Sequence, residues 1–277
     1  MLNFTLQMVT KIKNLLESTS DQEKNLVSLE RCLYFMNVKP EEGYKGLDIL
    51  EKVLRNGKSV SIKKERLAWP TTGGLKIKNL WVKYREGLPY ALSGISLDIP
   101  SGTKVGIVGR TGAGKSTLIS AIYRTFDNYK GQIYIDGKEI RKVDLKVLRF
   151  TMTIIPQDPY LFEDSIRNNI DPMAQFGDQA IKDILADVGL WRKFAGLEGL
   201  KTRIEKGGSN LSQGEKQLVC LARAMLFDNK LVLMDEATAN IDSQTEALIQ
   251  RLIKEKFERS TILMIAHRLN TILHCDK

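Results

Sequence analysis

The chain has 277 residues, with Lys+Arg 42 against Asp+Glu 33 and a formal net charge of +9. Hydrophobic residues make up 43% and charged residues 27%, a globular balance that excludes a disordered, collagen-like or disulfide-stapled chain. The three cysteines, Cys32, Cys220 and Cys275, lack metal-ligand spacing, as expected of reduced thiols inside a cell. The basic excess is spread along the chain, so we expect no nucleic-acid partner.

The first part of the chain predicts a helical extension and a linker. Residues 1–16 are apolar but carry Asn3, Gln7, Lys11 and Lys13, so we expect no membrane span in this chain. Ser20 and Glu23 form a capping box, which predicts that an amphipathic helix begins there and ends before Pro40. Its apolar side is formed by Leu26, Leu29, Leu33 and Met36. Residues 41–74 predict a linker, and a second domain is expected to begin near Leu75.

From residue 75 onward, short apolar strands alternate with helices. Strands are predicted at residues 75–84, 91–99, 103–109, 132–135, 230–234 and 261–266. Helices are predicted at residues 178–188, 212–226 and 244–257. This order predicts an α/β domain with a largely parallel sheet and helices on its faces.

The strongest motif is a glycine-rich loop after the strand at residues 103–109. It reads Gly109-Arg110-Thr111-Gly112-Ala113-Gly114-Lys115-Ser116-Thr117 and fits the pattern G-x-x-x-x-G-K-[ST]. The glycines let backbone N–H groups surround phosphate oxygens, and the following helix presents its positive end to the anion. Lys115 is expected to neutralise the β- and γ-phosphates, and Ser116 to bind Mg²⁺. The motif therefore predicts a nucleotide phosphate site.

A second acidic element follows the buried strand at residues 230–234. Two carboxylates, Asp235 and Glu236, end this strand, which is costly unless a cation or reacting water lies at its tip. Asp235 fits a Mg²⁺ ligand, and Glu236 fits a residue that orients or deprotonates the attacking water. The alternative is a strand that simply ends in a polar turn.

Between these motifs, Leu211-Ser212-Gln213-Gly214-Glu215 resembles the signature sequence of ATP-binding-cassette (ABC) ATPases. Ser212 can cap the helix at residues 212–226, so its hydroxyl, the Gly214 N–H and the helix dipole form a surface that faces an anion. A plain N-cap is the alternative. The resemblance implies that Ser212, Gln213 and Gly214 contact ATP bound to an opposing domain.

Further residues resemble the ABC pattern in the family's order. Gln157 resembles the Q-loop glutamine that meets Mg²⁺ and the attacking water, and Asp242 resembles the D-loop aspartate. His267 is similar to the switch histidine that contacts the γ-phosphate. Tyr84 resembles the aromatic residue that stacks on adenine, although Trp81 and Tyr90 lie close by and strand aromatics commonly pack inward.

The resemblance extends to the C subfamily of ABC transporters, the multidrug-resistance-associated exporters. It rests on residues 25–31, 105–118 and 217–224, so nearly the whole chain is covered. Glu236 favours the second nucleotide-binding domain, because the first often carries Asp there. The signature departs from that domain's usual Val-Gly-Gln, and family domains continue past the position of Lys277, so we expect a chain truncated at both ends.

The resemblance implies a P-loop NTPase (ABC ATPase) fold of class α/β. Its parts are a mainly parallel core sheet, an antiparallel β subdomain, a helical signature subdomain at about residues 159–226 and an N-terminal helical extension. Residues 75–277 would be the nucleotide-binding domain, and residues 1–74 would hold the end of the last transmembrane helix, the amphipathic helix and the linker.

The expected activity is hydrolysis of ATP with Mg²⁺ to power export of solutes. The resemblance implies membrane-spanning domains and an opposing nucleotide-binding domain as partners, at the cytoplasmic face of a membrane transporter; the isolated chain would be cytosolic. Two alternatives remain open from the sequence. One is a soluble ABC ATPase of the DNA-repair or translation kind, and the other is a non-catalytic ATP-binding fragment.

Overall fold

The computed structural model describes residues 2–38, 69–126, 129–236, 241–266, 272 and 274–277. The chain divides into two compact units, Met1–Glu42 and Gly43–Lys277, and each is described by itself.

In the described part of the first unit the chain forms one helix, α1 (Leu2–Met36). The predicted helix start at Ser20 is wrong, because Ser20 and Glu23 lie inside α1. No Pro or Gly interrupts the sequence before Ser20, so a helix that has nucleated propagates through it. Among the described residues, no helix is both long enough and apolar enough to cross a membrane.

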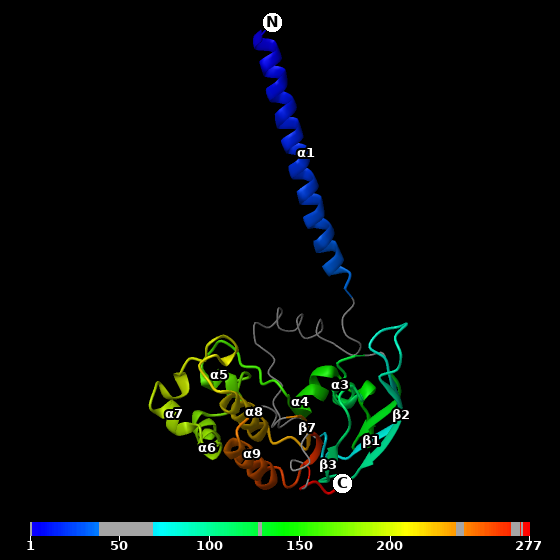
Figure 1. Cartoon of the computed structure of the whole chain (residues 1–277), viewed down its shortest axis with the longest axis vertical. Coiled ribbons are helices and arrows are strands. Elements are labelled where there is room, and N and C mark those ends of the chain that lie inside the picture. Colours follow the sequence, from blue (N-terminus) through cyan, green and yellow to red (C-terminus); the bar gives the residue numbers. More distant parts are fainter. Residues whose placement is uncertain (1, 39–68, 127–128, 237–240, 267–271, 273) are drawn as a thin grey trace, which may run out of the picture. The chain divides into compact units, whose positions relative to one another are not determined.

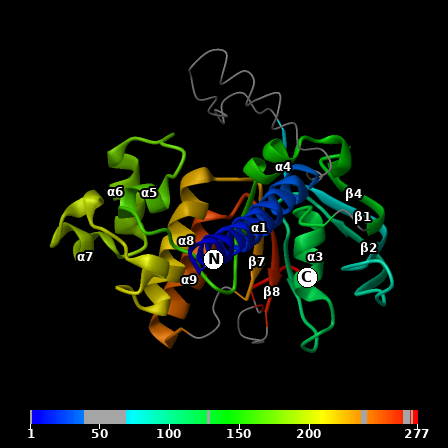
Figure 2. The same cartoon turned by 90° about the horizontal axis from the view of Figure 1, so that it is seen from above.

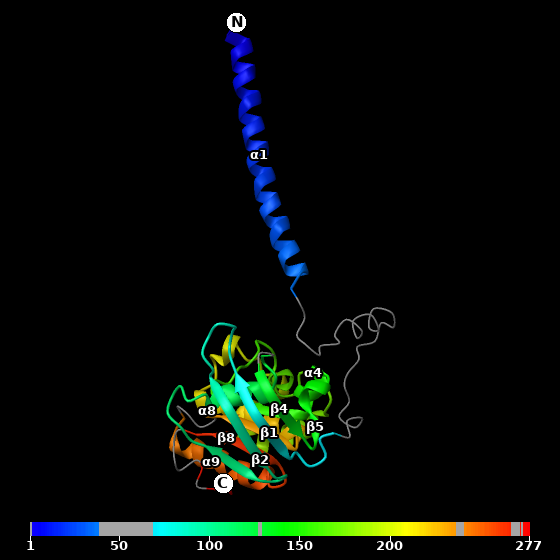
Figure 3. The same ribbon diagram turned by 90° about the vertical axis from the view of Figure 1, so that its right-hand side faces the viewer.

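The second unit contains two four-stranded sheets (Figure 1). The antiparallel sheet has the order β2-β1-β4-β5 and is seen face-on in Figure 3. Its strands are β1 (Leu75–Val82), β2 (Leu92–Ile99), β4 (Tyr129–Ile135) and β5 (Lys138–Glu139). The parallel sheet has the order β3-β8-β7-β6. Its strands are β3 (Lys104–Ile107), β6 (Met152–Ile155), β7 (Leu231–Asp235) and β8 (Thr261–Ile265).

Helices cover both faces of the parallel sheet. Figure 2 shows α3 between the two sheets, with α5 to α9 on the opposite side of the parallel sheet. The helices that the structure describes in this unit are α3 (Lys115–Ile122), α4 (Leu145–Thr151), α5 (Ile166–Ile170), α6 (Asp178–Asp187), α7 (Trp191–Ala195), α8 (Gln213–Phe227) and α9 (Ser243–Lys256). Single 3₁₀ turns occur at η2 (Ile140–Lys142), η3 (Gly199–Lys201) and η4 (Lys206–Gly208).

The apolar core forms two clusters, and β7 lies between them because it is buried on both faces. Val232 and Met234 pack into the apolar cluster shared with α5 to α9, whereas Leu231 and Leu233 pack into the cluster around α3 and the antiparallel sheet. A strand that is buried on both faces has a continuous run of apolar residues, whereas a strand with one face in solvent alternates apolar and polar residues. This double burial holds fixed the strand that ends at Asp235.

The predicted strands and helices of the second unit are confirmed within a few residues at each end, including the α/β class with a mainly parallel sheet. The exception is β4, which starts at Tyr129 rather than at residue 132. The short elements β6, α4, α5 and α7 were not predicted, since four to seven residues carry too little periodicity to be recognised.

Residues 69–74, predicted to belong to a linker, pack on the second unit instead. The Asp136 carboxylate accepts the backbone N–H of each of residues 71–74, at 2.7 to 3.1 Å. Partial burial opposes ionisation, but these hydrogen bonds outweigh it and lower the pKa of Asp136 to about 2. Gly73 lies so close to the start of β7 that an added Cβ would be 2.3 Å from the Lys230 carbonyl oxygen. Within the described residues, packing against this unit is therefore present from Trp69 onward.

Candidate nucleotide-binding site

The glycine-rich loop joins β3 to α3, as the motif requires. Gly112 and Gly114 adopt φ values of +82° and +86°, a left-handed conformation that glycine reaches without strain. At Gly114, the residue before α3, an added Cβ would also lie 2.7 Å from the Ala91 carbonyl oxygen. These glycines bring the loop around the N-terminus of α3, where backbone N–H groups and the helix dipole favour an anion.

Lys115 holds its ammonium against this loop. Its Nζ donates to the carbonyl oxygens of Gly109 at 2.8 Å and Arg110 at 3.1 Å. The side chain is buried at the edge of the site, and no carboxylate is paired with it in the described part of the chain. A buried ammonium that bonds only to carbonyl oxygens keeps its full charge for an anion.

Ser116 and Asp235 meet across the sheet. The Ser116 hydroxyl donates to Oδ1 of Asp235 at 3.2 Å, although the two residues are far apart in the sequence. Ser116 follows β3 and Asp235 ends β7, and β8 separates these strands. Because the carboxyl ends of parallel strands share one edge of the sheet, the fold brings hydroxyl and carboxylate together.

Glu236 follows at a sharp turn. Its backbone N–H donates to the Ile265 carbonyl oxygen at 3.0 Å, and its φ is +47°, in the left-handed region that a non-glycine residue rarely adopts. Such a conformation costs about 1 kcal/mol or more and is concentrated at functional sites. The chain therefore leaves the sheet immediately after Asp235 and turns at Glu236.

Gln157 lies at the same edge of the sheet. In the parallel register Ile155 is opposite Met234, so Gln157, two residues after the end of β6, follows the strand end that lies beside the end of β7. The Gln157 side chain is exposed. The predicted switch residue His267 follows β8, whose last residue Ile265 is opposite Asp235, but His267 itself lies outside the described residues.

Tyr84 contacts the helix that follows the glycine-rich loop. Its hydroxyl lies 2.6 Å from Oγ1 of Thr117, and its ring packs edge-to-face on Phe126 at 5.3 Å between centroids. Half of Tyr84 is exposed, which leaves ring surface for a ligand. The neighbouring aromatics Trp81 and Tyr90 pack on each other at 5.0 Å instead.

The signature segment forms the start of α8. Ser212 caps the helix through a capping box in which its hydroxyl accepts the Glu215 N–H at 3.2 Å and Glu215 accepts the Ser212 N–H at 2.8 Å. Burial tends to raise the pKa of Glu215, but hydrogen bonds from Lys193 and from the Ser212 N–H outweigh it and lower that pKa. The predicted N-cap is confirmed.

The starts of α8 and α9 lie side by side. An added Cβ at Gly214 would be 3.2 Å from the Thr245 side chain and 3.5 Å from Oδ2 of Asp242. Asp242 caps α9 by accepting the Thr245 N–H at 2.9 Å, and that bond lowers its pKa. Among the described residues, no hydrogen bond joins Ser212 or Gly214 to the glycine-rich loop. The residues of the site thus form two groups, one at the loop and one at the paired helix starts.

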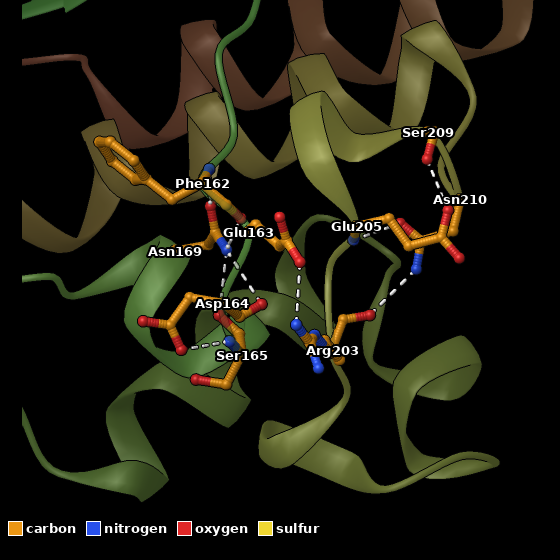
Figure 4. Close-up of polar contacts among 9 residues, drawn as sticks. All are labelled: Phe162, Glu163, Asp164, Ser165, Asn169, Arg203, Glu205, Ser209 and Asn210. Carbon is orange, nitrogen blue, oxygen red and sulfur yellow. Dashed lines mark hydrogen bonds and ion pairs between the residues drawn. The ribbon is translucent and has the colours of Figure 1, made fainter. Parts of the chain in front are cut away.

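Sequence reasoning missed the polar network behind α8. Arg223 donates to the Tyr160 carbonyl oxygen at 3.0 Å and to Oδ1 of Asn169 at 3.1 Å. Asn169, fully buried, closes the preceding turn by bonding both backbone groups of Phe162 (Figure 4). Arg223 could have indicated this network from the sequence, because it interrupts the apolar pattern of α8 and a buried guanidinium requires hydrogen-bond acceptors.

Figure 4 also shows how the segment before α5 is joined to the segment before α8. Arg203 forms an ion pair with Glu163 at 2.8 Å, and its carbonyl oxygen accepts from the Asn210 amide at 3.0 Å. A single β-bridge joins Ser165 to Arg203. The two segments therefore form one bonded unit beside the start of α8.

A groove of about 480 Å³ lies beside this network. Aromatic and other apolar side chains line most of it, and the exposed side chains of Tyr160 and Met173 belong to its lining. Most of its residues come from α4, β6, α8 and the segment after Gln157, and the others are Tyr123, Pro156 and Asn229. Such an exposed apolar surface is typical of a site of contact with another protein segment.

A parallel sheet with a glycine-rich loop at one strand end, and a hydroxyl and a carboxylate beside it, defines a P-loop nucleotide-binding domain. Residues 92–239 match the family model described as ABC transporter. The chain belongs to the ABC transporter family, and it contains that family's ATPase domain.

Relatives of the chain include transporters of the C subfamily and of the efflux type. The chain is 38% identical over 277 residues to the vacuolar heme ABC transmembrane exporter abc3 of Schizosaccharomyces pombe, covering 100% of this chain and 18% of that protein. It is 39% identical over 277 residues to ATP-binding cassette sub-family C member 2 of Rattus norvegicus, covering 100% and 17%. It is 40% identical over 283 residues to the pleiotropic ABC efflux transporter of multiple drugs YBT1 of Candida glabrata, covering 95% and 16%. The chain thus spans less than a fifth of the length of these relatives.

Proposed function

We propose that this domain binds and hydrolyses ATP with Mg²⁺ and thereby powers export of solutes by a C-subfamily ABC transporter. The observation that carries the proposal is the 3.2 Å contact between the Ser116 hydroxyl and the Asp235 carboxylate beside the glycine-rich loop. Glycines at positive φ, a buried lysine and a helix N-terminus supply the phosphate site next to it.

The donor set fits Mg²⁺. This ion binds oxygen ligands at about 2.0–2.1 Å in octahedral geometry, so neighbouring ligands lie about 3 Å apart, close to the separation of Ser116 and Asp235. It uses few protein ligands besides substrate phosphates and water, in keeping with the absence of a cluster of three or more His, Cys, Asp or Glu ligands among the described residues. When bound, Mg²⁺ would neutralise charge on the β- and γ-phosphates.

The chain's own residues would supply positioning and proton transfer. Lys115 would exchange its bonds to the Gly109 and Arg110 carbonyl oxygens for phosphate oxygens, and Tyr84 would offer its ring to adenine. Glu236 would orient the attacking water and accept its proton, with Gln157 after the neighbouring strand end at the same edge of the sheet. His267 would contact the γ-phosphate. The barrier falls because charge and geometry are arranged in advance.

The second group of residues supports a paired arrangement. Ser212, Gln213 and Gly214 begin a 15-residue helix whose N-terminus favours an anion, yet they make no hydrogen bond to this chain's own loop within the described residues. We infer that they complete the ATP site of an opposing nucleotide-binding domain, with Asp242 beside them. ATP would then hold two domains together, and hydrolysis would release them.

The groove beside Arg223 supports contact with membrane-spanning domains. The groove is apolar and exposed, and Arg223 in its lining donates a hydrogen bond to Tyr160 in the segment after Gln157. A helix seated in the groove would therefore contact that segment and move with it. Because the relatives are named as transmembrane exporters and efflux transporters, a helical loop of the membrane domain is the occupant we propose. A soluble nucleic-acid or translation ATPase is disfavoured, since the relatives named above are transporters.

The experiment is phosphate release from ATP by the purified 277-residue chain, with Mg²⁺ titrated against a chelator. Ser116→Ala should raise the Mg²⁺ concentration needed for half-maximal turnover by about tenfold, because a direct ligand is lost. Ser120→Ala, one turn later on α3, is the matched control and should behave like the unsubstituted chain. Turnover that needs no divalent cation, or equal behaviour of the two variants, would reject the assignment.

A further inference from the structure

Gln217 is a polar side chain in the buried part of α8, with only 2% of its surface exposed. It lies three residues after Gly214, so both residues share one face of the helix. Its Nε2 donates to the Pro156 carbonyl oxygen at 3.1 Å. The helix that begins with the signature residues is thus bonded to the residue directly before Gln157.

This hydrogen bond orients the peptide group that leads into Gln157. Proline has no N–H, so its carbonyl is the one backbone group through which Pro156 can be held. The peptide that joins Pro156 to Gln157 is planar, so fixing its oxygen also fixes the direction of the Gln157 N–H. Gln157 itself is exposed, at the point where the chain leaves β6.

The other end of the Gln217 amide argues against a space-filling role. Its Oε1 is buried and has no hydrogen-bond partner among the described residues. An apolar side chain of similar size would fill the same space without leaving an acceptor unpaired, which folded proteins generally avoid. The amide group at this position therefore serves to donate the hydrogen bond from Nε2 to the Pro156 carbonyl oxygen.

A second attachment makes the same segment follow α8. Arg223, further along the helix, donates to the Tyr160 carbonyl oxygen at 3.0 Å, four residues after Pro156. The segment is therefore held to α8 at two levels, on either side of Gln157. These two hydrogen bonds leave little slack between α8 and the segment that contains Gln157.

We propose that Gln217 is a positioning residue that sets the placement of Gln157 and couples it to the signature end of α8. The inference rests on the proposed function, because it takes Gln157 to act on the reacting water and Ser212 to Gly214 to contact an opposing ATP. It adds a connection between them within one chain. Engagement of the signature by one ATP would align Gln157 at the other.

The test compares Gln217→Met with Gln250→Met in the 277-residue chain. Both substitutions replace a helical glutamine that has a buried side-chain atom without a hydrogen-bond partner in the described residues, but Gln250 lies in α9, away from the site. Without nucleotide, hydrogen exchange of the peptide that contains Gln157 and Asp158 should quicken by about fivefold in Gln217→Met only, as expected for one lost hydrogen bond. Exchange equal to the control overturns the proposal.

A double-mutant cycle then separates positioning from general damage. Gln217→Met should lower kcat by about tenfold with little change in ATP affinity, and should have no further effect in a Gln157→Ala background. Additive losses, or a loss of affinity equal to the loss of kcat, would overturn the coupling. If Gln217→Met unfolds, Gln217→Asn shortens the amide and withdraws the same donor. Failure of the unsubstituted chain to bind ATP with Mg²⁺ would reject the proposed function, while the exchange measurement still decides the positioning.

Discussion

The Ser116 hydroxyl and the Asp235 carboxylate lie 3.2 Å apart, one at the start of α3 and the other at the end of β7. Three features make this contact possible. Left-handed glycines turn the loop back over β3, the parallel sheet aligns its strand ends, and β7 is buried on both faces. The relationship joins a phosphate-binding loop to an acidic strand end, which is the requirement for a Mg²⁺–nucleotide site.

Removing the Lys115 ammonium should weaken nucleotide binding. The side chain would lose charge-assisted hydrogen bonds worth about 1.5–3 kcal/mol, so Lys115→Ala should raise the ATP dissociation constant by about ten- to a hundredfold. Titration calorimetry measures this directly. Lys201→Ala, on an exposed 3₁₀ turn, is the control with the same loss of charge. Equal affinity of the two variants would contradict the assigned phosphate site.

The role of Ser212 can be separated from its role as a helix cap. Ser212→Ala should cost about 1 kcal/mol of stability because the cap is lost, whereas Ser212→Asn keeps a capping oxygen and should be stable within a few tenths. If Ser212 contacts an opposing ATP, both variants should lose turnover. Ser165→Asn makes the same exchange at the N-cap of α5 and should retain activity. Turnover that follows stability alone would mean that Ser212 is only a cap.

Asp136 predicts a pH-dependent contribution to stability. Its pKa is lowered from 3.8 to about 2, so the carboxylate stabilises the fold fully above about pH 4 and loses this contribution as the pH falls toward 2. Allowing for solvent screening, the contribution is about 1 kcal/mol. Asp136→Asn should therefore unfold at lower denaturant concentration at pH 7, and the difference from the unsubstituted chain should shrink toward pH 2.

The control for this comparison is Asp98→Asn on β2, which removes a carboxylate whose ion pair with Lys76 is exposed. Exposed pairs contribute little, so this variant should change stability by less than 1 kcal/mol. A difference between the Asp136 variant and the unsubstituted chain that stays constant from pH 7 to pH 2 would show that the carboxylate charge is not the cause.

Local patterns were sufficient for much of this structure. The glycine-rich loop, the acidic end of β7 and the helix cap at Ser212 each lie within a few neighbouring residues, and the structure places all three as predicted. The predicted start of α1 at Ser20 was wrong. A capping sequence does not end a helix when the residues before and after it both favour helix.

Long-range contacts could not be predicted in this way. Residues 69–74 have the composition of a linker, but contacts with distant residues, above all the Asp136 carboxylate, make them part of the domain. The bond from Gln217 to Pro156 joins positions 61 residues apart. Neither follows from spacing along the sequence, because the partner is supplied by the packing of other elements.

Single-turnover hydrolysis of ATP by Glu236→Gln measures whether Glu236 is the base that activates the attacking water. The substitution keeps size and hydrogen bonding but removes the base, so ATP affinity should be retained while the rate falls by about a hundredfold or more. Glu255→Gln, exposed on α9, should hydrolyse ATP at the unsubstituted rate. Hydrolysis by Glu236→Gln at the rate of this control would contradict the assignment of Glu236 as the base. Among the described residues, no other carboxylate follows Asp235 at the end of β7.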